Sequence, residues 1–280
     1  MPQRTQILHN VLFSILFLSV LFSCKKKERK FLQNLKSTTK LVQQTVEKNK
    51  TSLKTIASKI TVDFITGHFD PSTDSTFIQV SDKYADRHGM YMKKQAYDAF
   101  LKMWTAAKKD GINLEIRSAA RNFDYQKGIW ERKWTGETKL STGENASKAY
   151  TKPEERALKI LEYSSMPGTS RHHWGTDVDF NNFNNDWFEK GEGLKLFTWL
   201  ENNASDFGFC RPYTQKDNKR PYGYNEEKWH WSYMPLSRAY TEFAQKELNN
   251  QNIKGFKGSD VASAIDVVNK YVLGINHSCK

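Results

Sequence analysis

Residues 170–179 read Ser-Arg-His-His-Trp-Gly-Thr-Asp-Val-Asp, and residues 227–233 read Glu-Lys-Trp-His-Trp-Ser-Tyr. In the first stretch, His172 and Asp179 lie seven residues apart, whereas two ligands of one metal ion on a helical face need a separation of three or four. Gly175 lies between them, and the spacing therefore predicts a loop that turns at this glycine into a strand. The second stretch alternates as a strand, and we expect it to lie beside the first.

The two stretches together hold the groups of a catalytic zinc site. His172 and His230 supply two neutral imidazoles, Asp179 supplies a carboxylate, and Glu227 lies three residues before His230. Catalytic zinc sites have three protein ligands, an open position for water and a general base that is not a ligand. We therefore predict Zn²⁺ bound by His172, Asp179 and His230. Glu227 is the predicted base, which takes a proton from water and later passes it to the leaving amine.

Several neighbouring residues have other interpretations. His173 could replace His172 as a metal ligand, but the motif spacing favours His172. His173 is expected to face solvent or to contact one of the metal-binding residues. Asp177 is expected to accept a hydrogen bond from a ligand imidazole rather than to bind the metal. Three tryptophans are expected in the core and the cleft walls rather than as carbohydrate platforms: Trp174, Trp229 and Trp231.

Other hydrolytic chemistries have little support in the chain. There is no Gly-x-Ser-x-Gly elbow of a serine hydrolase, and no His-Glu-x-x-His helix of the commonest zinc-protease design. Cys210 lacks the surroundings typical of a cysteine nucleophile. The zinc interpretation is therefore the one that the residues favour.

A third stretch supports a family resemblance. Residues 118–126 read Ser-Ala-Ala-Arg-Asn-Phe-Asp-Tyr-Gln and follow a predicted strand at 114–118. It is similar to the family stretch Ser-x-x-Arg-Ser-x-x-x-Gln. Together with Ser170-x-His172-x-x-Gly175-x-x-x-Asp179 and Glu227-x-Trp229-His230-Trp231, it resembles the VanY-like D-alanyl-D-alanine carboxypeptidases. These zinc peptidases of peptidoglycan (LAS-type) form a group with L,D-carboxypeptidases and phage endolysins. The resemblance covers roughly residues 62–236.

The resemblance implies a function and further site residues. It implies that Arg121 orients the substrate and stabilises the transition state, and that Ser170 and Gln126 line the substrate pocket. It implies an α+β fold, a single domain with a small central antiparallel sheet flanked by helices, as in D-Ala-D-Ala peptidases and hedgehog-like zinc domains. Two positions depart from the family pattern, with Asp177 in place of alanine and Ser232 in place of arginine.

We therefore expect a zinc-dependent D-alanyl-D-alanine carboxypeptidase that trims peptidoglycan stem peptides and acts as a monomer. Two alternatives stay open. The same chemistry could act on another bond, as in an L,D-carboxypeptidase or a peptidoglycan endopeptidase. A non-catalytic, zinc-containing, cell-wall-binding lipoprotein is the alternative from another class.

The first 24 residues predict a lipoprotein signal peptide. The apolar run at 11–22 is shorter than the roughly twenty residues of a membrane span. It is followed by Ser23 and Cys24 and then by three lysines, so Cys24 is the predicted lipidated residue of an envelope protein, facing the periplasm or the cell surface. An uncleaved anchor and an ordinary signal peptide cut nearby are the alternatives.

The positive charge is concentrated next to this segment. The chain has a net charge of +12, of which residues 25–60 carry +9 and residues 61–280 only +2. We read residues 25–60 as a basic helical or disordered stalk that faces anionic lipid or cell-wall polymer. Because residues 61–280 are nearly neutral, we do not expect nucleic acid to be a partner of this chain.

The remaining chain divides into a zinc carboxypeptidase domain, residues 61–236, and a C-terminal helical extension, residues 237–280. Loops at 132–150 and 211–226 are expected to rim a cleft. Cys210 and Cys279 could pair or remain free thiols. Helices are predicted at 93–110, from a capping box of Thr151 and Glu154 to residue 163, and at 193–203, 237–248 and 260–273.

Overall fold

The computed structural model describes residues 39–40 and 60–280. The chain divides into two compact units, Met1–Ser58 and Lys59–Lys280. In the first unit, only Thr39 and Lys40 are described, and both are helical and exposed. The predicted signal peptide with Cys24, and nearly all of the predicted stalk, therefore lie outside the described residues. No helix in the described part of the chain has the length and apolar character needed to cross a membrane.

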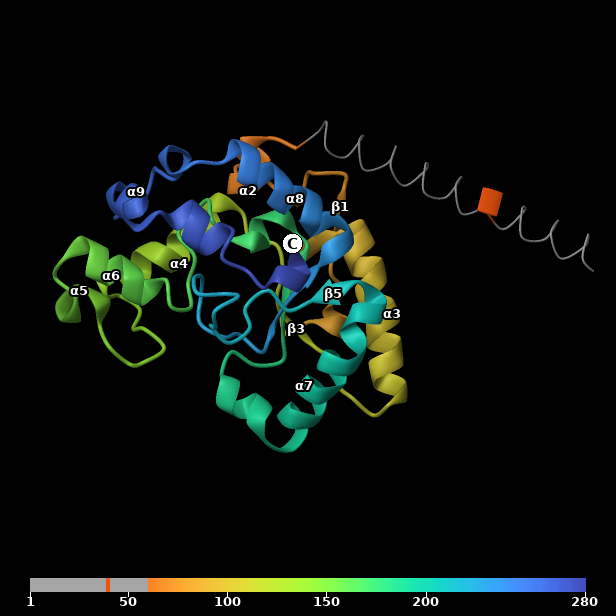
Figure 1. The fold of residues 1–280 in the computed structure, drawn as a ribbon. Helices are drawn as coiled ribbons and strands as arrows, with labels where there is room; N and C mark the ends of the chain where they lie inside the picture. The colour runs from red at the N-terminus through yellow and green to blue at the C-terminus, as the bar shows by residue number, and fades with distance from the viewer. Residues whose placement is uncertain (1–38, 41–59) are drawn as a thin grey trace, which may run out of the picture. The chain divides into compact units, whose positions relative to one another are not determined.

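A small antiparallel sheet forms the centre of the second unit (Figure 1). Its four strands lie in the order β3-β4-β6-β5, and every neighbouring pair is antiparallel. The bounds are β3 (Ile116–Ser118), β4 (Asp177–Phe180), β5 (Phe209–Cys210) and β6 (His230–Tyr233). The predicted α+β architecture with a small central sheet is confirmed.

The alternation of side chains along β4 and β6 separates an apolar face from a polar face. Val178, Phe180 and Trp231 belong to the hydrophobic core. Side chains in a strand point alternately to opposite faces, so the residues between them share the other face. In the pairing of β4 with β6, Asp179 lies opposite His230 and Asp177 lies opposite Ser232.

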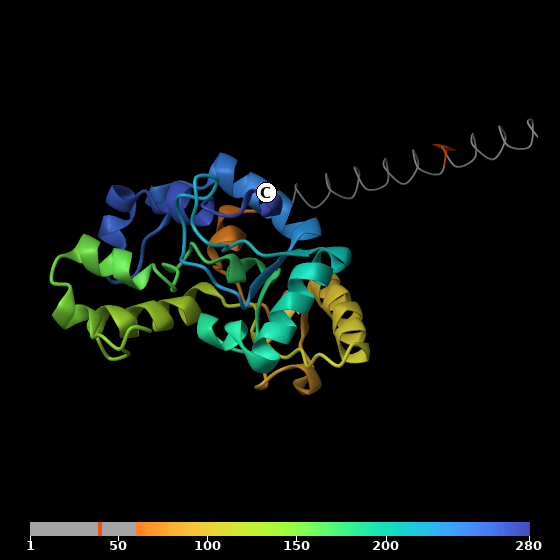
Figure 2. The same ribbon diagram turned by 60° about the horizontal axis from the view of Figure 1, so that its bottom comes forward.

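Two long helices cover the apolar face, α3 (Lys94–Lys109) and α7 (Gly191–Asn203). They lie close to the sheet in both ribbon views (Figures 1 and 2). Both correspond to helices that the sequence predicted. Buried side chains such as Phe100, Met103 and Leu200 each contribute about 1.5–3 kcal/mol to stability. A separate two-stranded sheet, β1 (Phe77–Gln79) and β2 (Tyr91–Lys93), leads into α3.

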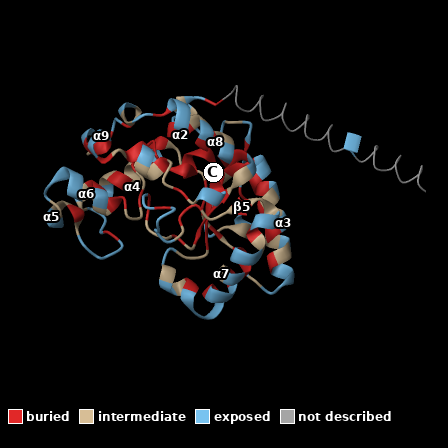
Figure 3. Ribbon diagram, viewed as in Figure 1, coloured by how far each residue is buried: buried red, intermediate tan, exposed pale blue. Residues whose placement is uncertain are grey.

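The 3-10 turn η2 (Arg171–Trp174) contacts β4, and α8 (Met234–Glu247) contacts β6; α2 (Val62–Thr66) packs against both η2 and α8. Trp174 packs edge-on against Tyr240 of α8, with ring centroids 5.9 Å apart. Its indole nitrogen donates to the carbonyl of Ile65 in α2. Buried residues gather around the sheet, whereas the outer sides of α3, α5, α6 and α7 are exposed (Figure 3).

A group of helices extends to one side of the sheet, at the left of Figure 1: α4 (Phe123–Thr135), α5 (Ala146–Ala149), α6 (Pro153–Ile160) and α9 (Ala262–Ile265). No helix was expected from the sequence at the position of α4. Its signals were nevertheless present, because the Asn122 side chain caps its first turn and Gly136 ends it in the left-handed conformation.

Three predictions of local structure were wrong. Residues 132–150 are not all loop, since they contain the end of α4 and all of α5, which Asn145 caps. The capping box of Thr151 and Glu154 does not form. Pro153 favours an extended residue before it, so Lys152 becomes the N-cap, without a side-chain hydrogen bond.

The predicted helix at 260–273 is the third error. Asp266 takes a left-handed conformation with φ of 56° and ends α9. Its carboxylate accepts hydrogen bonds from Asn250 and Asn269, which stabilise this break. The chain then continues as a π-helical turn over Val268–Val272.

The last residues pack in the same compact unit as the sheet. A disulfide joins Cys210 of β5 to Cys279 across a sequence separation of 69. The sequence had left this pairing open. The disulfide ties residues 237–280 to the sheet edge that carries β5.

Candidate zinc and substrate site

The structure brings the three predicted zinc ligands together on the polar face of the sheet. His172 Nε2 lies 3.2 Å from Asp179 Oδ2, and His230 Nδ1 lies 3.1 Å from Asp179 Oδ1. One ligand atom from each residue falls within 4.8 Å of the others, and all three residues are buried. The two motifs therefore meet as the sequence predicted.

Gly175 makes the turn between His172 and β4 possible. Its φ of 70° lies in the left-handed region, and a Cβ there would come within 2.2 Å of the Phe77 ring. Only glycine fits this combination of conformation and contact. The carbonyl of Gly175 also accepts from the backbone N–H of Lys93, which fastens the turn to β2.

The orientation of His172 is set by a backbone carbonyl. Its Nδ1 lies 2.8 Å from the carbonyl oxygen of Ala119. A carbonyl only accepts, so Nδ1 carries the proton and Nε2 presents its lone pair to the site. Burial lowers the pKa of His172, which favours the neutral form that a metal ligand requires.

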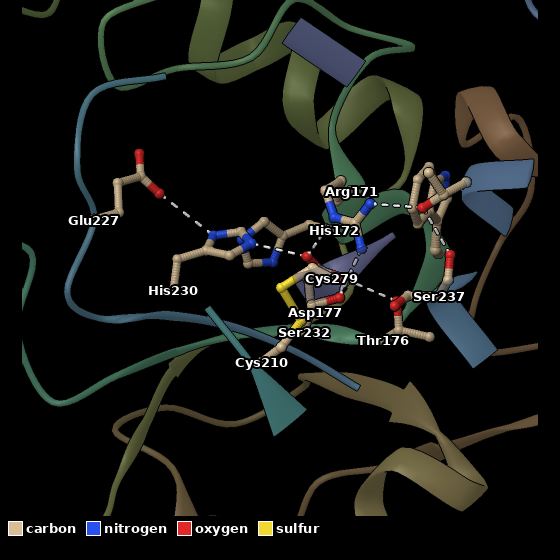
Figure 4. A network of polar contacts seen from close by, with 12 residues as sticks. Arg171, His172, Thr176, Asp177, Cys210, Glu227, His230, Ser232, Ser237 and Cys279 are labelled. Carbon is tan, nitrogen blue, oxygen red and sulfur yellow. Dashed lines mark hydrogen bonds and ion pairs between the residues drawn. A yellow bond between two sulfur atoms is a disulfide. The ribbon is translucent and has the colours of Figure 1, made fainter. Parts of the chain in front are cut away.

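His230 has carboxylates on both sides of its ring (Figure 4). Its Nε2 donates to Asp177 Oδ2 at 2.9 Å, which leaves Nδ1 facing Asp179. Glu227 Oε2 lies 3.4 Å from the same Nδ1. The predicted hydrogen bond from a ligand imidazole to Asp177 is confirmed.

Asp177 belongs to a fully buried polar network. Arg171 Nε donates to its Oδ2 at 3.0 Å, and Ser232 Oγ donates to its Oδ1 at 2.7 Å. The guanidinium also donates to Ser232 and to Thr241 of α8. Burial alone would raise the pKa of Asp177, but the Arg171 charge and the His230 hydrogen bond hold it well below its usual value. The two departures from the family pattern thus lie in one network, which the sequence analysis did not foresee.

The atoms that face the site have unused hydrogen-bonding capacity. Among the residues that the structure describes, His172 Nε2 and Asp179 Oδ1 are buried and have no hydrogen-bond partner, although other polar atoms lie close. Two imidazole nitrogens and a carboxylate oxygen form a donor set that suits zinc. The residues present therefore fit a zinc ion.

Glu227 lies beside these ligands at the end of the loop before β6. Its side chain is buried, and its backbone N–H donates to the carbonyl of Tyr213. Burial raises the pKa of Glu227 above its usual value. A carboxylate with a raised pKa accepts a proton more readily, which is the property that a general base needs.

A cavity of about 820 Å³ adjoins the site. It is lined by every catalytic, metal and substrate residue that the sequence predicted. Both predicted rim loops contribute, with Thr142 from the first and Tyr213 and Tyr224 from the second. Trp229 lines the cavity, and Trp174 and Trp231 are buried, as expected.

The predicted substrate residues also have free polar atoms. Arg121 donates to Ser118 Oγ at 3.3 Å, and Gln126 donates to the carbonyl of Ser165 at 2.8 Å. Within residues 39–40 and 60–280, three other buried atoms have no hydrogen-bond partner: Arg121 Nε, Gln126 Oε1 and Ser170 Oγ. These atoms can bind a substrate without breaking a contact within the fold.

His173 does not face solvent. It is fully buried, and its Nδ1 donates to the carbonyl of Arg121 at 2.6 Å. Its Nε2 accepts from the backbone N–H of Gly168 at 3.0 Å. Burial lowers the pKa of His173 to about 3, so the ring is neutral. It connects the backbone of the arginine motif to that of the histidine motif.

A family model described as VanY, D-alanyl-D-alanine carboxypeptidase, matches residues 89–236, which is more than half of the chain. The chain belongs to this VanY family. All three motifs, at residues 118–126, 170–179 and 227–233, lie inside the matched range. The family that the motifs suggested is confirmed.

Curated relatives and a solved structure are also similar. The putative carboxypeptidase YodJ of Bacillus subtilis is 29% identical over 173 residues, covering 60% of this chain and 55% of the relative. A D-alanyl-D-alanine carboxypeptidase of Enterococcus faecalis is 29% identical over 137 residues, covering 49% and 46%. The chain thus spans about half the length of these relatives. A mutant of the vancomycin resistance D,D-pentapeptidase VanY, in complex with Zn(II), is 25% identical with a TM-score of 0.45, covering 64% of this chain and 89% of that one.

Proposed function

We propose that this chain is a zinc-dependent D-alanyl-D-alanine carboxypeptidase that trims peptidoglycan stem peptides. One observation carries the proposal. In a chain of the VanY family, two imidazoles and a carboxylate converge at the wall of a cavity with the buried Glu227 beside them. This is the arrangement of three ligands and a separate base that catalytic zinc sites use.

When bound, a zinc ion acts as a Lewis acid that polarises a carbonyl group and makes water more acidic. His172, Asp179 and His230 would hold it. Glu227 takes one proton from the attacking water, whose oxygen forms a bond to the carbonyl carbon. As the C–N bond breaks, Glu227 passes this proton to the leaving amine. Arg121 provides positive charge next to the substrate.

The test uses the full chain loaded with zinc and a set of defined muropeptides analysed by mass spectrometry. We expect a pentapeptide ending in D-Ala-D-Ala to lose its last alanine, and Glu227→Gln to abolish this loss. Cleavage of a tetrapeptide only would indicate an L,D-carboxypeptidase. Cleavage of cross-linked dimers only would indicate an endopeptidase. No zinc-dependent cleavage of any of them would leave a non-catalytic wall-binding lipoprotein.

We also propose that the protein is a monomeric lipoprotein of a bacterial envelope, anchored through Cys24. The support is the short apolar run at 11–22, followed by Ser23, Cys24 and three lysines. Expression with a labelled fatty acid should give a labelled membrane-bound protein, and Cys24→Ala should remove the label. An unlabelled wild type would contradict the anchor, and a dimer in light scattering would contradict the monomer.

A further inference from the structure

Lys133 is a cation of the cavity wall to which the sequence analysis gave no role. It lies seven residues after Gln126 on α4, and both side chains line the cavity. Seven residues are about two helical turns, or about 10 Å along the axis. Lys133 therefore stands on the same helical face as Gln126, farther along the cavity.

The contacts of Lys133 leave its charge without a counterion. Its Nζ donates to Ser164 Oγ, a neutral hydroxyl. Among the described residues, no carboxylate lies within ion-pair distance of this nitrogen. Two other lysines of this helical group have different partners: Lys159 pairs with Glu162 at 2.7 Å, and Lys127 of α4 donates to the carbonyl of Gly255 at 2.8 Å. Lys133 differs from both because its side chain lines the cavity, where a substrate can supply the counterion.

A second unpaired cation faces the same space. Within the described part of the chain, the Arg121 guanidinium donates to the Ser118 hydroxyl and has no carboxylate partner. Burial and the Arg121 charge lower the pKa of Lys133, and the Glu227 charge opposes this. Two like charges in a partly buried wall disfavour each other, and an anion between them relieves both.

We propose that Lys133 binds a carboxylate of the substrate and leaves Arg121 to act at the carbonyl that is cleaved. This inference rests on the proposed function. The carboxylate has two sources, the free terminal carboxylate of the leaving residue or a carboxylate within the stem peptide. In either case Lys133 determines specificity, because it makes the cleft select substrates that carry a negative charge at that point.

The test combines three peptides with four proteins. The peptides are a pentapeptide ending in D-Ala-D-Ala, the same peptide with an amidated terminal carboxylate, and the same peptide with its D-glutamyl carboxylate amidated. The proteins are the zinc-loaded full chain, Lys133→Met, Lys133→Arg and Lys148→Met. Lys148 is the control, since it is an exposed lysine of α5 that does not line the cavity.

We expect Lys133→Met to lower kcat/KM for the parent peptide by about 10- to 100-fold through a higher KM, as for loss of a charged hydrogen bond. Lys133→Arg should restore most of it, and Lys148→Met should match the wild type. One of the two amidated peptides lacks the carboxylate that Lys133 binds, and on that peptide Lys133→Met should cause no further loss of kcat/KM. The peptide that behaves in this way identifies the carboxylate. Equal losses on all three peptides, or no loss at all, would overturn the proposal.

A binding experiment separates this inference from the proposed activity. Calorimetry with Glu227→Gln measures binding of the uncleaved peptides, with and without Lys133→Met. If the wild type does not cleave the peptides but binds them in a way that depends on Lys133, the proposed function is wrong and this inference stands. Turnover or binding that does not depend on Lys133 would remove only this inference. Thermal unfolding of each variant checks the fold, and Lys133→Met should be at least as stable as the wild type because it removes an unpaired charge.

Discussion

The two sides of the His230 ring differ in how completely their polar groups are paired. On the Asp177 side, both carboxylate oxygens and the Arg171 guanidinium have hydrogen-bond partners, and both side chains are fully buried. On the cavity side, buried polar atoms of Ser170, Gln126 and Arg121 have no hydrogen-bond partner in the described part of the chain. The paired side holds the ligand in place, and the unpaired side offers its atoms to a metal ion and a substrate.

The cations show the same difference. Arg171 is neutralised by Asp177 and also stacks 4.4 Å from the Trp174 ring. Arg121 and Lys133 line the cavity, and among the described residues their charged groups have only hydroxyl partners. Unpaired polar groups in a buried site reduce stability, and proteins retain them where they bind a ligand. Substitutions on the paired side should therefore affect stability and metal affinity, and substitutions on the cavity side should affect turnover.

The largest effect is expected for Glu227→Gln on the cavity side. Glutamine keeps the shape of the side chain but does not accept the proton from water, so kcat should fall by about 10²- to 10⁴-fold. Bound zinc, measured by mass spectrometry of the metal, should stay unchanged. Loss of zinc from this variant would mean that Glu227 is a ligand rather than the base.

Arg171→Met should have the largest effect on stability. It leaves the Asp177 carboxylate buried without its counterion, which costs about 3–5 kcal/mol in the free energy of unfolding. Urea denaturation measures this value. Lys133→Met, the matched substitution on the cavity side, should not lower it. Equal destabilisation by the two variants would contradict a difference in stability role between the two sides of the ring.

The disulfide between Cys210 and Cys279 should contribute somewhat less to the free energy of unfolding than the Arg171 charge does. Cys279→Ser releases residues 237–280 from β5, and α8 supplies Thr241 to the Arg171 network. A loss of about 2–4 kcal/mol in the free energy of unfolding is expected. Addition of a reductant to the wild type should reproduce this loss, and should not change the Cys279→Ser variant. If the reductant does not change the stability of the wild type, the prediction is contradicted.

Asp177→Asn should weaken zinc binding without removing a ligand. The amide accepts the His230 proton less strongly and can turn its own donors toward the ring, so zinc affinity should fall about 10- to 100-fold. Competition with a chelator measures the dissociation constant. Ser170→Ala, on the cavity side, should keep the wild-type affinity. An unchanged affinity in Asp177→Asn would show that the paired side does not orient the ligand.

The smallest effect is expected at Lys93, which belongs to neither side of the His230 ring. Burial lowers its pKa to about 8, while Asp74 at 3.9 Å opposes the shift. An unfolded lysine has a pKa of about 10.4, so the unfolded chain binds more protons between these values. The stability of the wild type relative to Lys93→Met should therefore rise as the pH increases from about 8 to 10. A difference that does not change with pH would contradict the lowered pKa.

The sequence predicted the site better than its surroundings. The seven-residue spacing with Gly175, and the alternation in β6, were sufficient to place His172, Asp179 and His230, because a strand leaves little freedom in side-chain direction. The Arg171 network was not predictable in this way. Arg171 and Ser232 are 61 residues apart, and their contact depends on the register between β4 and β6.

Lys133 was missed for a different reason. Its role depends on α4, and that helix has weak amphipathic character, with Phe123, Gln126 and Trp130 as its buried residues. The capping signals of Asn122 and Gly136 would have found the helix. They would not have shown that Lys133 faces a cavity, because the walls of that cavity come from segments far apart in the chain.

Anomalous X-ray diffraction at the zinc absorption edge, from zinc-loaded crystals of the protein, tests directly whether the three ligands share one zinc ion. We expect one strong peak about 2.0–2.2 Å from His172 Nε2, His230 Nδ1 and an Asp179 carboxylate oxygen. A zinc-loaded crystal with no peak at these three residues, or with its zinc bound elsewhere on the chain, would contradict this expectation.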